Sequence, residues 1–400
     1  MSTDAFNFDR PIDTNHLSRM KWEYEIERTG RPDILCFGTA DMDFASAPAI
    51  VAALTHTAQQ GHYGYPHRPS AYYDAIIGYY QRHFGWQLER SWIQPNAGVY
   101  ASMAGVIEEL TEKDDEILYQ TPVHHVFKEL IELNHRVPVA NPLINEHGHY
   151  TMDFAQLESV ITPRTKLMLL CSPHNPVGRV WTPDELRQLV DICVAHNIII
   201  LADEVYCGLL FAGERFTPIA TVSPAASTHV ITFMSASKSF NLTGLKHSFT
   251  ITPHPAHTAI CQMAARRASL GYGLSQFGVV ATEIAFRDCD AWSAAVMDYI
   301  VANYQFVAEF CSRHLPDVCV TQPQATFMLW LDMRNLPIPH ATLHTFFEEQ
   351  ANILVVNGAA LGSDGTGFIR LNIGAPRSVI AQGLERIVAA CTAAGYCPSR

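Results

Sequence analysis

The interpretation of this chain is organised around one stretch, Ser235-Ala236-Ser237-Lys238-Ser239-Phe240-Asn241-Leu242-Thr243-Gly244-Leu245-Lys246, which follows a strand-like run at Thr228–Phe233. A lysine just after a strand can form a Schiff base with an aldehyde cofactor. The hydroxyls of Ser235 and Ser237 and the second cation, Lys246, can hold a phosphate, because charge-assisted hydrogen bonds to phosphate are strong. Taken alone, the stretch is equally typical of a solvated loop, so the other motifs must decide.

Composition excludes several classes of protein. The 400 residues carry a formal net charge of -12 without a basic run, so neither nucleic acid nor an anionic membrane is an expected partner. The N-terminus, Met1–Asn7, is polar and acidic, unlike a signal peptide, and no uncharged apolar run reaches membrane-spanning length. The ten cysteines form no C-x-x-C pair. We therefore expect free thiols in a reducing cytoplasm, without a disulfide framework or a zinc site.

From Trp92 onward, strand-like runs alternate with helical patterns. The runs are Glu116–Gln120, Arg136–Ala140, Lys166–Cys171, Ile198–Ala202, Thr228–Phe233 and Ser248–Thr252. Helices are predicted from about Pro48, with Ser46 as its cap, and over Pro183–His196, with Thr182 or Asp184 as its cap. Such alternation predicts an α/β fold in which helices cover both faces of a mostly parallel sheet and ligands bind at the carboxyl ends of the strands.

After about residue 285 the pattern changes to a long helical stretch, four strand-like runs and a closing helix. These are Ala291–His314, then Val318–Thr321, Phe327–Asp332, Ile353–Asn357 and Gly367–Asn372, and finally Ser378–Ala394. We predict three parts: an N-terminal arm, residues 1–45, that packs with the small domain; a large domain, residues 46–285; and a small α+β domain, residues 286–400.

Two motifs follow predicted strands. The strand ending at Ala202 delivers Asp203-Glu204-Val205-Tyr206, where a carboxylate could keep a pyridine nitrogen protonated and Tyr206 could donate to a phenolic oxygen. The strand ending at Cys171 delivers Ser172-Pro173-His174-Asn175-Pro176-Val177-Gly178, in which Asn175 is a candidate second donor. The alternative for the first motif is that Asp203 caps a helix and Tyr206 packs in the core. The alternative for the second is that Asn175 forms an Asx turn.

Three more motifs could complete a site. Asn96-Ala97-Gly98-Val99-Tyr100-Ala101-Ser102 opens a helix, and backbone N–H groups at a helix start bind phosphate well. Thr121-Pro122-Val123-His124-His125 follows a strand; no carboxylate or cysteine partner has metal-ligand spacing nearby, so loop histidines are the alternative to a functional pair. One arginine of Gly367-Phe368-Ile369-Arg370-Leu371-Asn372-Ile373-Gly374-Ala375-Pro376-Arg377 could clamp a carboxylate.

In their order and approximate separations, these motifs resemble those of the pyridoxal-phosphate (PLP) enzymes of fold type I, the aspartate aminotransferase superfamily with its class I/II aminotransferases. The resemblance implies a large domain with a seven-stranded sheet, a smaller C-terminal domain and PLP bound through Lys238. It picks Arg370 for the substrate carboxylate and leaves Arg377 as a structural ion pair. The implied cofactor-binding residues are Lys238, Asp203, Tyr206, Asn175, His124, Gly98, Val99, Tyr100, Ser235, Ser237 and Lys246.

Within that superfamily the chain is similar to the MalY/PatB branch of cystathionine β-lyases and cysteine C–S lyases. The likeness is carried by Asp41-Met42-Asp43-Phe44, Cys171-Ser172-Pro173-x-Asn175-Pro176, Ser235-x-Ser237-Lys238-Ser239-Phe240-Asn241 and Arg370-Leu371-Asn372-x-Gly374-x-Pro376-Arg377. It implies a homodimer with shared active sites, in which Tyr65 and the loop Gly273-Leu274-Ser275 face the partner's cofactor. It also places the backbone of Ala40, with Asn175, near the substrate carboxylate.

The chain departs from this branch at three positions. His124 replaces a tyrosine that stacks on the cofactor ring, and it would titrate between about pH 5 and 8. Tyr206 stands where the branch has a histidine, and Lys246 occupies the phosphate-cation position of ordinary aminotransferases. Pro66-His67-Arg68 and Gly271-Tyr272-Gly273 flank the expected substrate entrance.

The leading hypothesis is a cytoplasmic PLP enzyme that acts on an amino acid through an external aldimine and a quinonoid, by C–S β-elimination. Lys238, His124 and Tyr65 are its predicted catalytic residues. The alternatives are a β/γ-replacement or a carbon–carbon bond- or ring-forming enzyme of a specialised pathway, which His124 motivates, and an aminotransferase. A PLP-binding regulator without turnover is the alternative from a different class, although no sequence typical of a DNA-binding domain is attached.

Overall fold

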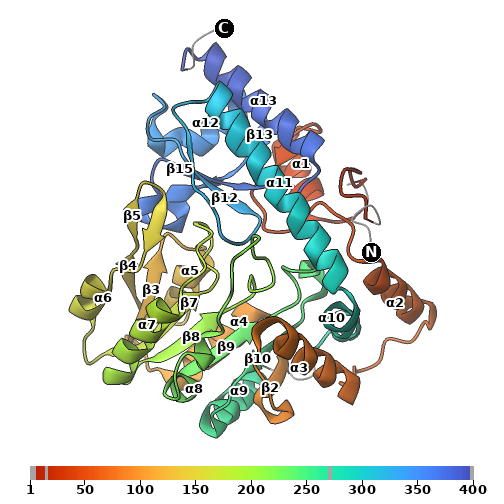
Figure 1. Cartoon of the computed structure of the whole chain (residues 1–400), viewed down its shortest axis with the longest axis vertical. Helices are drawn as coiled ribbons and strands as arrows, with labels where there is room; N and C mark the ends of the chain where they lie inside the picture. The colour runs from red at the N-terminus through yellow and green to blue at the C-terminus, as the bar shows by residue number, and fades with distance from the viewer. Residues whose placement is uncertain (1–5, 14–16, 269–272, 397–400) are drawn as a thin grey trace.

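The computed structural model describes residues 6–13, 17–268 and 273–396. Its centre is a seven-stranded sheet with the order β2-β10-β9-β8-β7-β3-β4 (Figure 1). The strands are β2 (Ile93–Asn96), β3 (Glu116–Thr121), β4 (Val137–Pro142), β7 (Thr165–Cys171), β8 (Ile199–Asp203), β9 (Val230–Met234) and β10 (Ser248–Ile251). β9, β8, β7, β3 and β4 are parallel, whereas β10 is antiparallel to both neighbours. The predicted mostly parallel, seven-stranded α/β sheet is confirmed.

Helices cover both faces of this sheet, which explains why its central strands are continuous apolar runs. α4 (Val99–Leu110), α5 (Val126–Leu133) and α9 (Pro255–Arg267) pack on one face with Leu169, while α6 (Phe154–Val160), α7 (Pro183–Ala195) and α8 (Ala226–His229) pack on the other with Leu170. Successive strand residues point to opposite faces, so adjacent leucines serve the two layers.

The structure settles one alternative among the predicted elements and corrects two further details. Thr182, not Asp184, caps α7, in a reciprocal capping box with Glu185. Ser46 does not cap α2 (Pro48–Gln59), because Ala47 is the cap residue and Ser46 Oγ donates to Asn241 O at 3.2 Å. The run predicted as a strand from Thr228 begins with the last turn of α8.

The C-terminal part contains a second sheet, with the antiparallel order β11-β12-β15-β14. Its strands are β11 (Cys319–Val320), β12 (Met328–Asp332), β14 (Val356–Asn357) and β15 (Phe368–Asn372). The long helices α11 (Asp290–His314) and α13 (Arg377–Ala393) lie side by side along it (Figure 1). Near the N-terminus, β1 (Leu35–Cys36) pairs in parallel with β13 (Ile353–Leu354), so chain from the predicted arm contacts the C-terminal part. The three-part domain division stays a prediction.

Four further α-helices and one hairpin belong to the described chain. They are α1 (Glu25–Thr29), α3 (Ser70–Phe84), α10 (Gln276–Asp288), α12 (Leu343–Gln350) and the hairpin of β5 (Ile144–Glu146) and β6 (His149–Thr151). Among the described helices, none combines the length and the apolar character needed to cross a membrane.

Candidate active site

The predicted side chains meet at the carboxyl edge of the central sheet, where β8 ends at Asp203 and β9 ends just before Ser235. A cavity of about 300 Å³ lies there. Eight predicted cofactor residues line it, namely Gly98, Val99, Tyr100, Asp203, Ser235, Ser237, Lys238 and Lys246. Five further lining residues were not among the predicted cofactor residues, namely Ala97, Ala101, Val205, Thr243 and His247. Because these residues come from separate strand ends and one helix start, the sheet assembles the cavity as expected.

Lys238 presents its amine inside this cavity. Its Nζ donates a hydrogen bond to the Ala40 carbonyl at 2.7 Å. The pKa of Lys238 is lowered to about 8, chiefly by desolvation and also by the Arg370 guanidinium, while Asp41 and Asp203 oppose the change. A larger fraction of the amine is therefore neutral near pH 7 than for an exposed lysine, which makes it a better nucleophile and base.

Two adjacent carboxyls follow β8, and they differ in environment. Asp203 is 3% exposed, and burial raises its pKa to about 6, although Val205 N donates to its Oδ1 at 3.3 Å. Glu204 points elsewhere, where Ile219 N donates to Oε1 at 3.0 Å, and burial raises its pKa to about 8. Only Asp203 lines the cavity, and a cation beside it would stabilise its ionised form.

The opposite end of the cavity is formed by the start of α4 and the lysine loop. The cap residue Gly98 makes no side-chain cap bond, so the first-turn N–H groups of α4 are left for a ligand. Ser235 Oγ donates to His247 O at 2.6 Å, so its proton serves the loop rather than a phosphate. His247 Nε2 lies 2.8 Å from Tyr72 Oη, and burial lowers the pKa of His247 to about 3.

Arg370 lies on β15 and is 3% exposed. Its Nη2 donates to Gly38 O at 2.9 Å and its Nη1 to Asn175 Oδ1 at 3.3 Å, while its buried Nε has no partner among the described residues. Burial lowers the pKa of Arg370, and the nearby phenol of Tyr206 opposes this change. A buried guanidinium without a carboxylate partner is suited to an anionic ligand. Arg370 also lines a second cavity, of about 400 Å³, together with Ala40 and His124.

Arg377 does not form the predicted ion pair. Its Nε donates to Asn303 Oδ1 at 3.2 Å, and its guanidinium lies over the rings of Tyr299 and Phe306. Among the described residues no carboxylate pairs with it. Its role is to join α13 to α11.

His124 lines the second cavity, with Ala40 and Arg370, and is not part of the lining of the cavity around Lys238. Its ring is 5.9 Å from that of Tyr100, at an interplanar angle of 22°, and 4.5 Å from that of His125. Burial lowers the pKa of His124 well below 6.5, and the charges of Arg370 and Lys238 add to this effect. The imidazole is therefore neutral at pH 7, and the titration expected between about pH 5 and 8 is corrected to lower pH. Stacking on a cofactor ring stays a prediction.

We expect His124→Phe to keep ring stacking but remove a proton carrier. If His124 moves a proton in the reaction, kcat should fall by about 10²–10⁴-fold with unchanged cofactor affinity. Between pH 6 and 8 the pH–rate profile should keep its shape, because the wild-type imidazole is already neutral. Steady-state kinetics and cofactor titration measure both effects. His125→Phe is the matched control and should have little effect; equal activities of the two variants would reduce His124 to a stacking role.

Tyr65 and the described residues of the expected entrance are not in the lining of the two cavities described above. Tyr65 is 88% exposed, on the connection between α2 and α3. Arg68, which flanks the expected entrance, is close enough to lower the pKa of His247. Ser275 caps α10 by accepting a hydrogen bond from Gly278 N. Gly271 and Tyr272 lie outside the described residues. Across the described chain, no cluster of three His, Cys, Asp or Glu side chains could hold a metal ion.

Comparison with known proteins defines the class of protein to which this fold and cavity belong. Residues 32–387 match the model of the family Aminotransferase class I and II. The chain therefore belongs to the class I and II aminotransferase family.

Particular relatives are similar over nearly the whole chain. The chain is 32% identical to cystathionine beta-lyase PatB of Bacillus subtilis, over 96% of this chain and 99% of that protein. It is 29% identical to protein MalY of Escherichia coli, over 97% and 99%. Cystalysin from Treponema denticola, which contains a pyridoxal 5'-phosphate cofactor, matches with a TM-score of 0.93 at 28% identity, over 97% and 99% of the two chains. The PLP-bound C–S lyase from Staphylococcus hominis matches with a TM-score of 0.89 at 28% identity, over 96% and 98%. Fold type I is confirmed.

Proposed function

We propose that this protein is a PLP-dependent C–S lyase that removes a thiol from the β-carbon of an amino acid. The observation that carries the proposal is the grouping of Lys238, the buried Asp203 and the buried Arg370 around adjoining cavities. The family supports a PLP-type fold and site, and the cystathionine β-lyases and C–S lyases among the relatives support this reaction over others of the same fold. Cystathionine and cysteine conjugates are the proposed substrate class.

The residues present fit PLP. Asp203 is a buried carboxyl whose pKa is raised to about 6, and it would pair with the pyridine nitrogen. The first-turn N–H groups of α4, Ser237 and Lys246 would hold the phosphate, and Lys238 would hold the aldehyde carbon. When bound, PLP supplies an electron sink for the pair released at the α-carbon of the substrate.

The protein's own groups do the remaining work. Arg370, whose Nε is left without a protein partner, binds the substrate α-carboxylate, with Asn175 beside it. The amine of Lys238 takes the proton from the α-carbon, which its pKa of about 8 suits near neutral pH. His124 is neutral and its Nδ1 has no partner among the described residues, so the ring can accept or relay a proton beside the substrate, while the departing sulfur takes up the proton that Lys238 removed from the α-carbon.

An assay of the reconstituted enzyme with cystathionine and cystine tests the proposal. Pyruvate and ammonia should form together with a thiol from cystathionine and with a persulfide from cystine, without a keto acid being added. A parallel reaction with an α-keto acid should give little new amino acid. Transamination without pyruvate, or a replacement product formed only when a second nucleophile is supplied, would contradict β-elimination as the main reaction.

We also propose a cytoplasmic homodimer with shared active sites. The described cysteines are free thiols, which suits a reducing compartment. Tyr65 is 88% exposed on the single chain and would reach the phosphate in the partner's cavity. Light scattering should give a twofold dimer or a multiple of it.

Subunit mixing tests the sharing directly. Tyr65→Ala and Lys238→Ala should each lose activity as pure proteins. After they are mixed and reassorted at random, half of the dimers contain one intact site, so about one quarter of wild-type activity should return. The same experiment with Lys238→Ala and Asp203→Ala, which belong to one cavity, should restore none. A fully active monomer would contradict shared sites.

A further inference from the structure

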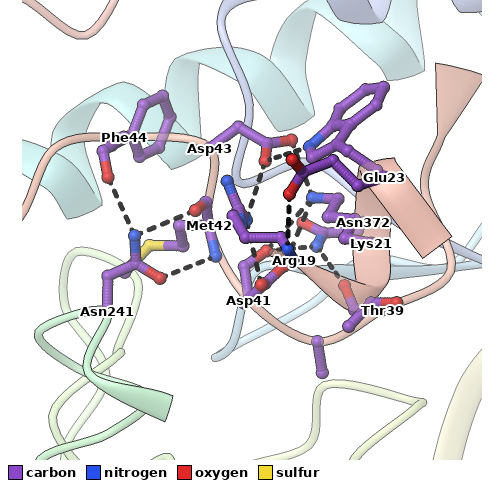
Figure 2. Close-up of polar contacts among 12 residues, drawn as sticks. Arg19, Lys21, Glu23, Thr39, Asp41, Met42, Asp43, Phe44, Asn241 and Asn372 are labelled. Atoms are coloured by element: carbon purple, nitrogen blue, oxygen red, sulfur yellow. Dashed lines mark hydrogen bonds and ion pairs between the residues drawn. The ribbon is translucent and has the colours of Figure 1, made fainter. Parts of the chain in front are cut away.

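A short segment, residues 39–44, which we name the strap, is held by the side chains of two asparagines (Figure 2). Its Ala40 carbonyl accepts a hydrogen bond from Lys238. The first of these asparagines is Asn372, at the end of β15, which is fully buried. Its Nδ2 donates to Thr39 O and to Asp41 O, each at 2.7 Å, and its Oδ1 accepts from Gly374 N at 2.8 Å. A single side chain thus fixes the carbonyls on either side of Ala40.

The second is Asn241, three residues after Lys238 in the lysine loop. Its Nδ2 donates to Met42 O at 2.9 Å and to Phe44 O at 2.8 Å, and its Oδ1 accepts from Met42 N at 3.0 Å. Figure 2 shows both carbonyls turned toward this amide. The later half of the strap is therefore fixed to the loop that carries Lys238.

The acidic side chains of the strap, Asp41 and Asp43, form ion pairs with Arg19 and Lys21. Lys21, 1% exposed, places its Nζ 2.7 Å from Asp43 Oδ2 and donates to Asp41 O at 3.2 Å. Arg19 Nη2 lies 2.9 Å from Asp41 Oδ2 and 3.2 Å from Asp43 Oδ1, and Trp22 Nε1 donates to Asp43 Oδ1 at 2.9 Å. Two cations match two anions, so the strap is held without a net buried charge.

These contacts leave the Ala40 carbonyl for Lys238, whose Nζ donates to it at 2.7 Å. We propose that Asn372 is a positioning residue for Lys238: by fixing the peptide groups on both sides of Ala40, it holds the carbonyl that receives the lysine amine whenever that amine is not bonded to the cofactor. The proposal rests on the proposed function, because it gives the amine that takes the α-proton a fixed place from which to act.

The charges around Lys238 make this carbonyl important. Arg370, on β15, and Lys246, in the same loop, both disfavour an ammonium at this site, whereas Asp41 and Asp203 favour it. The Ala40 carbonyl, 2.7 Å from Nζ, is an uncharged acceptor. It stabilises the protonated amine and fixes its direction without adding a further charge to the site. Displacing the carbonyl should therefore change the protonation of Lys238.

Asn372→Leu tests the proposal in the apoenzyme, because it removes both donors without changing charge. The chain has only six lysines, so competitive labelling with trace acetic anhydride, read by mass spectrometry, can follow Lys238 as pH is varied. The exposed Lys113 and Lys128 are internal references. The titration midpoint of Lys238 should fall by about one pH unit, because its ammonium loses an acceptor.

Asn303→Leu is the matched control. Asn303 is equally buried, and its Nδ2 also donates to two carbonyls, those of Ile373 and Ala375, at 3.0 and 2.9 Å. It does not hold the strap, so its loss should destabilise the protein similarly and leave the Lys238 midpoint unchanged. An equal midpoint in wild type and Asn372→Leu, or equal shifts in both variants, would overturn the proposal.

A measurement on the unsubstituted protein covers the case in which Asn372→Leu does not fold. The sequence contains only two Ala-Asp pairs, Ala40-Asp41 and Ala202-Asp203. Labelling alanine carbonyl carbons and aspartate nitrogens therefore isolates two signals. As pH is varied, the chemical shift of the Ala40 carbonyl should change with the same midpoint as the labelling of Lys238. A chemical shift that does not change over this pH range would contradict the proposed contact. Both readouts use apoenzyme without substrate, so they can fail or succeed independently of the elimination assay.

Discussion

Lys238→Ala protein should fold normally and lose turnover by about 10⁴-fold or more, because one substitution removes both the attachment point of the cofactor and the base for the α-proton. Steady-state kinetics of the variant with added PLP measures the loss. After borohydride treatment, wild-type protein should carry the cofactor on the peptide that contains Lys238, and the variant should carry none. The expected effect is large because Lys238 is the cavity amine whose pKa is lowered to about 8.

The pH dependence of attachment follows from the same pKa. Only the neutral amine attacks an aldehyde, and its fraction grows as pH rises through about 8. Uptake of PLP by the apoenzyme should therefore speed up from pH 6 to about 8 and then level off. Lys246→Ala is the informative comparison, since loss of the second lysine of the cavity should weaken retention of the phosphate while PLP still attaches covalently to Lys238. Label on Lys246, or a colourless protein that cannot be reconstituted, would contradict the assignment.

The fold was predictable where helices bury both faces of a strand. Lys166–Cys171 is a continuous apolar run because Leu169 and Leu170 serve opposite helical layers, and it forms β7. By contrast, β2 was not predicted, because it is an edge strand of four residues that contains Gln94, Pro95 and Asn96. The other edge strand, β4, was predicted because Val137, Val139 and Ala140 still give it an apolar run.

The candidate site was predictable to the extent that its residues follow strand ends. Asp203 and Lys238 could be found because chemistry gathers at the carboxyl edge of a parallel sheet. The protonation state of His124 could not be predicted from the sequence, because it depends on burial and on the charge of Arg370, which lies far along the chain. The contacts of the strap were equally hidden. Asn241 holds Met42 across 199 positions, and no local pattern encodes such a pairing.

The second large expected effect is on turnover, and it distinguishes the adjacent carboxyls of Asp203 and Glu204. Asp203→Ala protein should keep its fold and still bind PLP, but turnover should fall by about 10³-fold or more, because the electron sink loses the charge that keeps its ring nitrogen protonated. Steady-state kinetics with cystathionine measures the loss. Glu204→Gln is the matched control: Glu204 is fully buried next to Asp203 but turned toward Ile219. It should leave turnover nearly unchanged.

A stability measurement separates the electronic role of Asp203 from a structural one. Burial raises its folded pKa from 3.8 to about 6, so the folded apoenzyme binds more protons than the unfolded chain between these values. Apoenzyme stability should therefore fall as pH rises from about 4 to about 6, and Asp203→Asn should remove that part of the fall. A protonated ring nitrogen beside the carboxylate would offset this cost, so the rise in Tm on adding PLP at pH 7 should be larger for wild type than for Asp203→Asn. Equal rises in Tm, together with normal turnover of Asp203→Ala, would place the pyridine nitrogen elsewhere.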